Sequence, residues 1–304
     1  MISIAFTCER AAATRDTQAL LAAAPFSWTW KGKTIPNWSA DLVELEQLKI
    51  DEVAKRAAWR NAATLWDDRL REIQLITREV KREGVFALGA DPVVRRAFEG
   101  LRTDAASRDD IYNQGLAAVE VWKEANPGWS YSDDITSGGL GSLLAASLAQ
   151  KQSHGTKQRA WKRASNKLLF KAQRVDAENV AWYAAASRKF RPGTEGGTLL
   201  RSSVPTTSRP EAPVGQGEIT KVMAAGQEVH LDFEAPHATH FALLQQAPGS
   251  PVFLIVVPDT TQKSVTLHGL APGLHRFKVV PSNSNGEGPE SAAIEVTVAQ
   301  QQAA

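Results

Sequence analysis

Apolar side chains recur at helical spacing through the first part of the chain. From Trp59 to Val80 they follow one another at steps of three and four, the pattern of a helix that buries one face. Gly84 and Gly89 come directly after this run, and glycine commonly ends a helix. We therefore predict a long helix over residues 40–84.

A stricter repeat follows further along the chain. Between residues 161 and 186 the positions of one face alternate steps of four and three, which is the heptad pattern of packed helices. This seam consists of Trp161, Ser165, Leu168, Ala172, Val175, Asn179, Trp182 and Ala186. Its small residues allow a partner helix to approach closely, and Asn179 can fix the register at some cost in stability. An antiparallel bundle within one chain is favoured over a coiled coil between chains.

Turn and capping residues divide the remaining helical pattern. Ser153-His154-Gly155-Thr156 predicts a break, with helices over 140–152 and 157–190 on its two sides. Asp91 followed by Pro92 predicts a short helix to about residue 101, and Ser107 predicts a cap for another at 108–126.

The first 38 residues predict an arm. Residues 1–8 alternate loosely between apolar and polar and predict a strand, and residues 9–24 predict a short helix. The remainder contains two prolines and three tryptophans, which is typical of an extended segment. Burial of each large aromatic is worth about 2 kcal/mol or more, so we expect the arm to pack on its own bundle or on a neighbour. The anchors are Phe26, Trp28, Trp30 and Trp38.

Residues 191–213 predict a linker. They contain four prolines and three glycines, together with the apolar residues Leu199, Leu200 and Val204. We expect the linker to dock through these three side chains.

From Val214 onward the period of the pattern changes to two. Val229, Leu231 and Phe233 alternate with polar residues, and further short apolar runs are separated by Pro, Gly and Asn. The runs are 239–245, 252–257, 263–268, 275–281 and 292–298. Short strands at this spacing predict a β-sandwich.

The C-terminal region resembles a fibronectin type III domain. The resemblance lies in EVHLDFEAP, as the second strand, and in SVTLHGLAPGLHRFKVVPSNSNGEGPES, as the late strands. Phe233 stands where the family usually has a core tryptophan, and His275 stands near the place of its corner tyrosine. The matching positions are Leu270, Pro272, Gly273, Asn283, Gly286, Gly288 and Ser291. The resemblance implies a sandwich of about 85 residues and implies no chemistry, since fold is not function.

The predicted fold class is therefore multidomain, α plus all-β, with an elongated antiparallel helical bundle followed by a fibronectin type III-like β-sandwich. The predicted parts are an arm at 1–38, a bundle at 39–190, a docked linker at 191–213 and the sandwich at 214–300. The whole chain also resembles uncharacterised bacterial proteins that place a helical region before such a module.

Composition adds limits on class and compartment. The chain has 304 residues, of which 43% are apolar and 22% charged, and a single cysteine, so an intrachain disulfide is excluded. No basic stretch precedes an apolar one at the N-terminus, and no apolar run approaches the length of a membrane span. We expect no membrane span, and a protein that is either cytoplasmic or released by a non-standard route.

Charge is segregated along the chain. Residues 1–190 carry 28 Lys and Arg against 23 Asp and Glu, whereas residues 214–304 carry 4 against 8. An acidic block is formed by Asp41, Glu44, Glu46, Asp51 and Glu52. A basic block includes Lys157, Arg159, Lys162, Arg163, Lys167 and Lys171, and no acidic residue lies between Asp134 and Asp176. The two blocks can pair within the chain or between subunits, and nucleic-acid binding is the less favoured alternative.

Candidate chemistry is weak. Two histidines and a carboxylate near residues 230–240 could hold Zn²⁺, but the alternation places His230 and Asp232 on a solvent face. The glycine-rich run at 138–142 lacks the strand and the Gly-Lys-Ser/Thr that phosphate loops need. Adjacent Asp133 and Asp134 are typical of caps, and Cys8 has no histidine nearby in sequence. We expect no enzyme activity, no cofactor and no metal.

The most favoured function is a non-catalytic structural protein that self-associates as the repeating subunit of a filament or tube. The expected interface consists of the four arm aromatics and the two charge blocks. A leading strand in the arm could add to a neighbour's sheet edge. One alternative is a binding or adhesion module for a protein or polysaccharide, carried on a helical stalk. Another is a component of a phage or phage-like particle.

Overall fold

The computed structural model describes residues 4–132, 135–204, 212–283 and 286–299. The chain divides into two compact units. The first comprises Met1–Ala57, Ala160–Gly249 and Ile255–Ala304, and the second comprises Ala58–Arg159 and Ser250–Leu254. A helical N-terminal region is followed by an antiparallel β-sandwich, as the sequence predicts.

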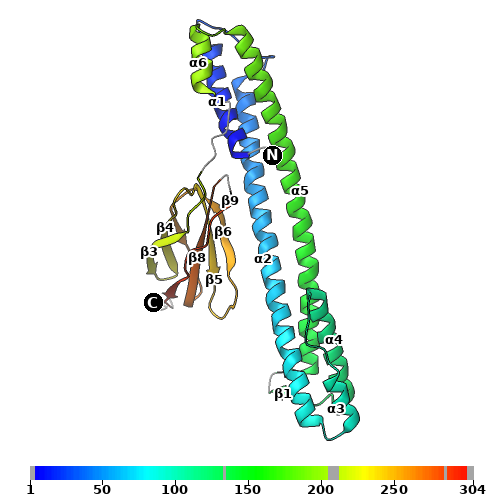
Figure 1. Ribbon diagram of the computed structural model, residues 1–304. Coiled ribbons are helices and arrows are strands. Elements are labelled where there is room, and N and C mark those ends of the chain that lie inside the picture. Colours follow the sequence, from blue (N-terminus) through cyan, green and yellow to red (C-terminus); the bar gives the residue numbers. More distant parts are fainter. Residues whose placement is uncertain (1–3, 133–134, 205–211, 284–285, 300–304) are drawn as a thin grey trace. The chain divides into compact units, whose positions relative to one another are not determined.

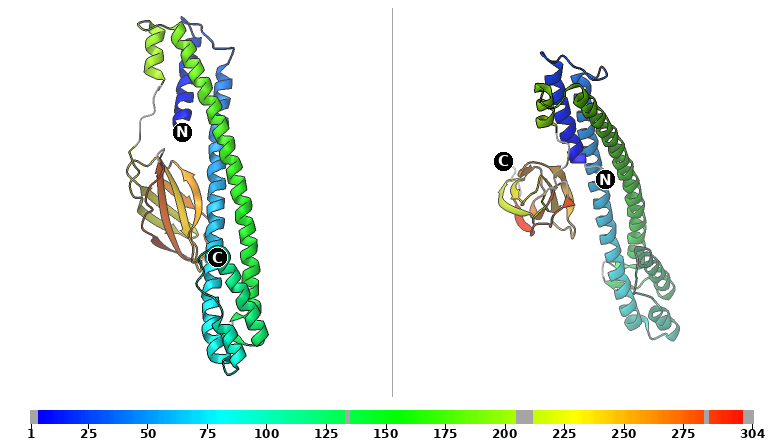
Figure 2. Two further views of the ribbon diagram at one scale, coloured as in Figure 1. Left: turned by 45° about the vertical axis from the view of Figure 1, so that its right-hand side comes forward. Right: turned by 45° about the horizontal axis from the view of Figure 1, so that its top comes forward.

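Two long helices contribute to both units. α2 runs over Ile35–Leu88 and α5 over Ser137–Lys189, with 54 and 53 residues, so each is about 80 Å long. Within each unit the two helices lie side by side and antiparallel (Figures 1 and 2). The predicted seam of α5 faces inward, because Leu168, Ala172, Val175, Asn179, Trp182 and Ala186 are buried. The packing within one chain that the heptad pattern favours is therefore present.

α1 spans Ile4–Ala22, so the predicted strand at residues 1–8 is wrong over the residues that the structure describes. The loose alternation of Ile4 and Phe6 is too short to outweigh the helical preference of the alanine-rich sequence after it. The buried face of this helix is mostly small and polar, so the sequence shows no apolar repeat at helical spacing there. It consists of Thr7, Ala11, Thr14, Thr17, Gln18 and Leu21.

The arm aromatics lie in the core of the first unit. Trp30 and Trp38 are buried, and their ring centroids are 5.9 Å apart. Phe26 and Trp28 are partly buried against Phe190 of the chain after α5, each with a centroid distance of 5.6 Å. The expectation that these aromatics pack on something is met by the chain's own bundle.

The linker contains a helix that the sequence analysis did not predict. α6 spans Glu195–Ser203, and the Thr194 side chain caps it by accepting a hydrogen bond from the Gly197 amide at 3.1 Å. Leu200 and Val204 are buried in the same cluster as Trp182, with Leu199 beside them. The predicted docking through these apolar residues is confirmed. The sequence did not predict α6, because the proline and glycine content of residues 191–213 is typical of a linker.

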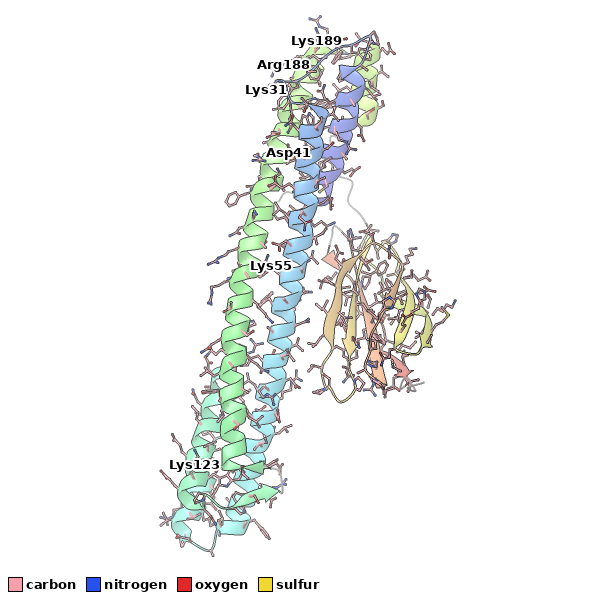
Figure 3. All side chains as sticks on the ribbon, turned by 180° about the vertical axis from the view of Figure 1, so that it is seen from behind. Lys31, Asp41, Lys55, Lys123, Arg188 and Lys189 are labelled. Carbon is pink, nitrogen blue, oxygen red and sulfur yellow. The ribbon has the colours of Figure 1, made fainter. Side chains whose placement is uncertain are left out.

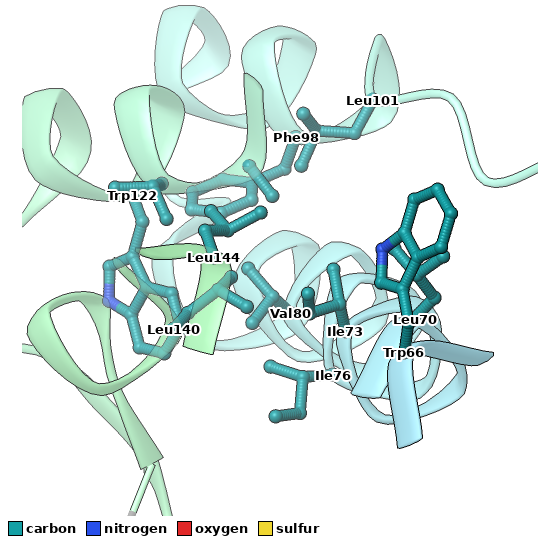
Figure 4. Packing of buried hydrophobic residues seen from close by; sticks show 12 residues of the cluster. Trp66, Leu70, Ile73, Ile76, Val80, Phe98, Leu101, Trp122, Leu140 and Leu144 are labelled. Carbon is teal, nitrogen blue, oxygen red and sulfur yellow. The ribbon is translucent and has the colours of Figure 1, made fainter. Parts of the chain in front are cut away.

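In the second unit, α3 (Pro92–Glu99) and α4 (Arg108–Ala125) pack with α2 and α5. The side chains of Asp91 and Ser107 accept hydrogen bonds from backbone amides at the starts of these two helices, as predicted. Figure 4 shows the core between the helices. Its largest members include Trp66, Ile73, Phe98, Trp122 and Leu144.

Two predicted interruptions are wrong. Gly84 lies inside α2 rather than at its end, because the missing side chain lets the Phe98 ring lie on the helix backbone; a Cβ there would be 2.5 Å from the ring. The predicted break at Ser153–Thr156 is also absent, and α5 is continuous through Gly155. A single helical glycine costs about 1 kcal/mol, which the contacts of neighbouring His154 with Trp59 and Trp66 can offset.

A short hairpin precedes α5. Strand β1 (Ser130–Ser132) pairs antiparallel with β2 (Ile135–Thr136). Neither strand was predicted, since both are too short for a period-2 pattern to show.

The sandwich has two antiparallel sheets. One has the order β3-β4-β7, and the other has the order β10-β8-β5-β6, with β9 paired to β8 (Figure 1). The strands are β3 (Glu218–Ala225), β4 (Glu228–Glu234), β5 (His240–Gln246), β6 (Leu254–Thr260), β7 (Ser264–Leu267), β8 (Gly273–Asn283), β9 (Gly286–Glu287) and β10 (Ile294–Val298). The predicted runs agree to within a few residues, but β3 was missed because most of its residues are exposed.

Both departures from the fibronectin type III pattern are accommodated. Phe233 takes the core position and contacts Phe241, with ring centroids 5.0 Å apart. His275 is buried, and its Nε2 lies 2.8 Å from the carbonyl oxygen of Ala271. Since a carbonyl can only accept, Nε2 carries the proton, and Nδ1 accepts from the Gln245 amide at 2.7 Å. The histidine thus makes the bond to upstream backbone that a corner tyrosine makes.

Candidate functional site

The first part of the acidic block pairs with the basic block inside the chain. Lys171 of α5 is buried, and its ammonium group donates hydrogen bonds to the carboxylates of Asp41 and Glu44 on α2. Arg174 lies 3.4 Å from Asp41. Lys33 also donates to Asp41, so this carboxylate has cations on several sides. Figure 3 marks Asp41 on α2. These contacts match the intrachain alternative for this part of the two blocks.

Asp41 is held ionised by this arrangement. Partial burial would raise the pKa of Asp41, but the hydrogen bonds from Lys171 and Lys33 outweigh it and bring the pKa below its usual value. The pKa of Glu44 is lowered as well, mainly by its hydrogen bond from Lys171. The cluster is therefore a set of paired charges rather than a proton donor.

The rest of the acidic block is also used locally. The Glu52 carboxylate accepts a hydrogen bond from the Trp161 indole at 2.6 Å, and Asp51 pairs with Lys55 one turn along α2.

Glu46 faces the Cys8 thiol. Burial, followed by the nearby Glu46, raises the pKa of Cys8 to about 12, so the thiol stays protonated at neutral pH.

The remaining cations of α5 form a surface that we call the basic face. It consists of Lys157, Arg159, Lys162, Arg163 and Lys167, all of them exposed. Within the described part of the chain, none of the five forms an ion pair, and Arg159 alone makes a side-chain hydrogen bond, to Thr156 at 3.2 Å. Figure 3 shows long side chains projecting from α5 on the side away from α2.

Apolar side chains continue the basic face toward the C-terminal end of α5. Phe170 is 71% exposed and Leu169 is 40% exposed. On a helix, residue 170 lies about two turns beyond Arg163 on the same side. An exposed aromatic beside unpaired arginines is typical of a contact surface, where aromatic and arginine side chains are enriched.

A cluster of aromatic and charged side chains in the second unit was not predicted. The Trp59 indole donates a hydrogen bond to His154 Nε2 at 2.7 Å, and His154 also contacts the Trp66 ring. Arg108 lies over the Trp66 ring, with its guanidinium carbon 4.7 Å from the ring centroid, and forms a bidentate pair with Asp67. These residues are far apart in sequence, so no local motif could have revealed the cluster.

The surroundings of His154 favour its neutral form. Burial, and then the positive charge of Arg108, lower the pKa of His154. A protonated Nε2 could no longer accept the Trp59 hydrogen bond. A small cavity of about 40 Å³ lies beside Trp66 and is lined by Asp109, Tyr112, Ser147 and Lys151 among others. This volume is sufficient for one or two water molecules.

Other predicted candidates occupy structural positions. Gly138, Gly139 and Gly141 lie in the first turns of α5, where the Thr136 hydroxyl caps the helix by accepting from the Gly139 amide at 3.0 Å. Asp133 and Asp134 lie outside the described residues.

His230 and Asp232, two of the residues considered for a metal, make hydrogen bonds within the sandwich. His230 bonds Asp232 and Thr266, at 3.0 and 2.9 Å. Among the residues that the structure describes, no three His, Cys, Asp or Glu side chains gather as a metal site, and no helix is long and apolar enough to cross a membrane.

A groove lies on the sandwich among the residues that the structure describes. It has a volume of about 400 Å³ and lies between the start of β3 and the start of β10. Its walls are Gln216–Ile219 and Ser291–Ile294, which combine small residues with the larger side chains of Gln216, Glu218 and the two isoleucines.

Comparison with known proteins concerns the sandwich. The solved structures that are similar include the FN1–FN3 domains of chicken CNTN1 (17% identity, 29% of this chain, 33% of that chain, TM-score 0.26). They also include the FN5 domain of Drosophila Lar (21% identity, 29% of this chain, 97% of that chain, TM-score 0.23). A third is the fibronectin type III domain of human fibronectin type III domain containing protein 3 (19% identity, 32% of this chain, 93% of that chain, TM-score 0.25). No family model and no curated protein matches the chain.

Proposed function

We propose that this protein is a non-catalytic structural subunit that self-associates into a filament or tube through charged surfaces of its helical region. The observation that carries the proposal is the basic face of α5. Its five cations are exposed and unpaired with any described carboxylate, although Lys171 on the same helix is fully engaged with Asp41 and Glu44.

Like charges on one helix face have a cost. Cations three and four residues apart repel each other by about 0.2–0.5 kcal/mol per pair, and Arg159, Lys162, Arg163 and Lys167 form such pairs. A partner with acidic side chains would relieve this repulsion. The sandwich has the opposite net charge, with 8 acidic against 4 basic residues over 214–304, so a second copy offers a matching surface.

The arm has no part in this proposal. The strand that could add to a neighbour's sheet is a helix over the described residues, and Trp30 and Trp38 are buried in the chain's own core. The proposal rests instead on the long helices α2 and α5, of 54 and 53 residues, whose exposed faces offer surface for contacts. A contact between two different surfaces that does not close on itself propagates into a filament. We also infer that the chain belongs with the bacterial proteins that its sequence resembles.

The test is the assembly state of the purified full-length chain. Light scattering and negative-stain electron microscopy would be recorded at about 20 mM and 500 mM salt, where the screening length falls from about 20 Å to about 4 Å. We expect ordered polymers at low salt that shorten or dissociate at high salt. A monomer in every condition would contradict the proposal.

A binding module is the second candidate, and the groove between β3 and β10 favours it. Its volume of about 400 Å³ is within the range of ligand sites, and its position along the starts of two strands suits an extended peptide. Isothermal titration with peptides or oligosaccharides would support this candidate if binding is lost when Ala292→Trp fills the groove. Unchanged binding would assign the ligand to another surface.

A further inference from the structure

The sandwich has an acidic counterpart to the basic face. Glu218 of β3 and Glu234 of β4 are directly opposite each other in the antiparallel register, and both are exposed. Residues opposite each other across two strands point to the same side of the sheet, with Cβ atoms about 5 Å apart. Within the described residues neither carboxylate has a cation in an ion pair. We call Glu218 and Glu234 the acidic pair.

The acidic pair carries the same kind of unrelieved repulsion as the basic face. Like charges placed directly opposite each other destabilise a sheet. Beyond Ile219 and Phe233, and after a shift in register, Lys221 lies opposite Asp232, and Asp232 bonds His230. The corner around the acidic pair is therefore net negative even with Lys221 included.

We propose that the basic face of α5 docks onto the acidic pair in the β3–β4–β7 sheet of a second copy of this chain. This inference rests on the proposed function and names the partner surface. The spacing of charges supports it: Arg159 and Arg163 are four residues apart on a helix, hence about 6 Å along its axis. The acidic pair lies side by side across the two strands, with Cβ atoms about 5 Å apart, so an α5 that runs along the strands brings both long arginine side chains within reach of the two carboxylates.

An apolar contact fits the same alignment. Met223 of β3 is 48% exposed and pairs with His230, four residues before Glu234. At about 3.4 Å per residue, Met223 is about 13 Å from the acidic pair. Phe170 is nine residues beyond the midpoint of Arg159 and Arg163, which is also about 13 Å. With α5 running along the strands in this direction, the exposed aromatic meets the exposed methionine when the two arginines lie over the acidic pair.

The contact joins two different surfaces, so it leaves one free copy of each surface at the ends of a dimer. Further copies can then add, unless the rotation closes a ring. This is the geometry that a filament of identical subunits needs.

The test uses two charge-reversal variants of the full-length chain. One carries R159E/R163E and the other carries E218R/E234R. Because all four positions are exposed, we expect both variants to fold, which circular dichroism checks. Analytical ultracentrifugation at low salt should show that each variant alone associates at least about tenfold more weakly than the natural sequence.

Mixing the variants is the decisive step. In an equimolar mixture the acidic α5 of R159E/R163E can meet the basic sheet of E218R/E234R. The natural α5 of E218R/E234R can meet the natural sheet of R159E/R163E. We expect the mixture to recover association to near the natural level. The control is R71E/R78E on α2, which makes the same change in net charge away from the basic face and should leave association unchanged.

The outcomes separate this inference from the proposed function. A natural chain that stays monomeric contradicts the proposed function. Assembly that survives both reversals, or a mixture that does not recover, overturns the docking alone. Loss of association on nuclease treatment would assign the basic face to nucleic acid and overturn it too.

Discussion

The ammonium group of Lys171 lies 2.6 Å from a carboxylate oxygen of Asp41, across 130 residues of sequence. The Lys171 side chain is 5% exposed, and that of Asp41 is 17% exposed. This pair joins α5 to α2 at the level where Lys33 also reaches the same carboxylate. It shows that opposite charges lie together inside the bundle, where removal of one partner leaves the other in a poorly solvated place.

Asp41→Asn should therefore destabilise the fold. The substitution leaves Lys171 and Lys33 without their shared carboxylate, and we expect the free energy of unfolding to fall by about 2 kcal/mol at pH 7. Urea titration followed by circular dichroism measures this. The matched control is Glu44→Gln, since the Glu44 side chain is 53% exposed and its loss should cost less than about 1 kcal/mol. Equal losses of unfolding free energy in the two variants would show that burial does not set the energetic contribution of each carboxylate.

The sign of the pH dependence at Asp41 follows from its lowered pKa. The folded state holds the ionised form more strongly than the unfolded chain does. The contribution of Asp41 to the free energy of unfolding is complete above the pKa that Asp41 has in the unfolded chain. It is lost as the pH falls through the pKa that Asp41 has in the folded state. Asp41→Asn should remove that part of the acid sensitivity.

Gly84→Ala should destabilise α2 although alanine is the better helix former. The gain in propensity is about 1 kcal/mol, but the new Cβ would lie 2.5 Å from the ring of Phe98, which is fully buried and cannot move away. Overpacking of this kind costs about 1–3 kcal/mol, so we expect a net loss in thermal unfolding experiments. Gly141→Ala in α5 is the control, because no atom lies within 4 Å of its Cβ position. That variant should gain about 0.5–1 kcal/mol. A gain at both positions would contradict the close packing of Phe98.

Asn179→Leu should stabilise the protein. Asn179 is 1% exposed, and neither its Oδ1 nor its Nδ2 has a hydrogen-bond partner among the described residues. A buried amide without partners costs about 1–3 kcal/mol, and leucine has a similar volume. We expect an increase of about 1–2 kcal/mol in urea titrations. Asn166→Leu, at an exposed position of the same helix, should change stability by less than about 0.5 kcal/mol. A loss of stability in Asn179→Leu would mean that the amide is satisfied in solution.

His154 should make stability sensitive to pH. The pKa of His154 in the folded state is below the ordinary histidine value of 6.5, so the unfolded chain binds more protons as the pH falls through that value. The stabilisation that neutral His154 provides is therefore complete above that pH and is lost as the pH falls through the lowered pKa of the folded state. Denaturation between pH 7.5 and 5.5 measures the loss, with His154→Gln as the comparison, since its amide can accept the Trp59 hydrogen bond at every pH. A pH dependence that is unchanged in His154→Gln would assign it to other groups.

Much of the fold was predictable from local patterns. The period-3.6 runs of α2 and α5 and the caps at Asp91 and Ser107 depend on residues that are close in sequence. The period-2 runs of the sandwich are equally local, and they carried the resemblance to fibronectin type III domains. These features follow from one buried face per element, which the chain displays directly.

The candidate site was less predictable. The charge blocks were visible in the sequence, but which cations would be paired was not. Lys171 and Arg163 are two turns apart on α5, yet only Lys171 faces α2. The face that each residue presents depends on the exact rotation of the helix against its neighbour, which packing decides.

The sequence by itself determined the two regions, the long helices, the sandwich strands and the segregation of charge. The tertiary structure alone decided that the helix predicted at residues 9–24 already includes Ile4, that the linker contains α6, that Gly84 and Gly155 interrupt nothing, and that Trp59, Trp66 and His154 meet. In each of these cases the local signal is weak or contrary. The free energy comes from contacts between segments that are distant in the chain, and only the folded arrangement brings those segments together.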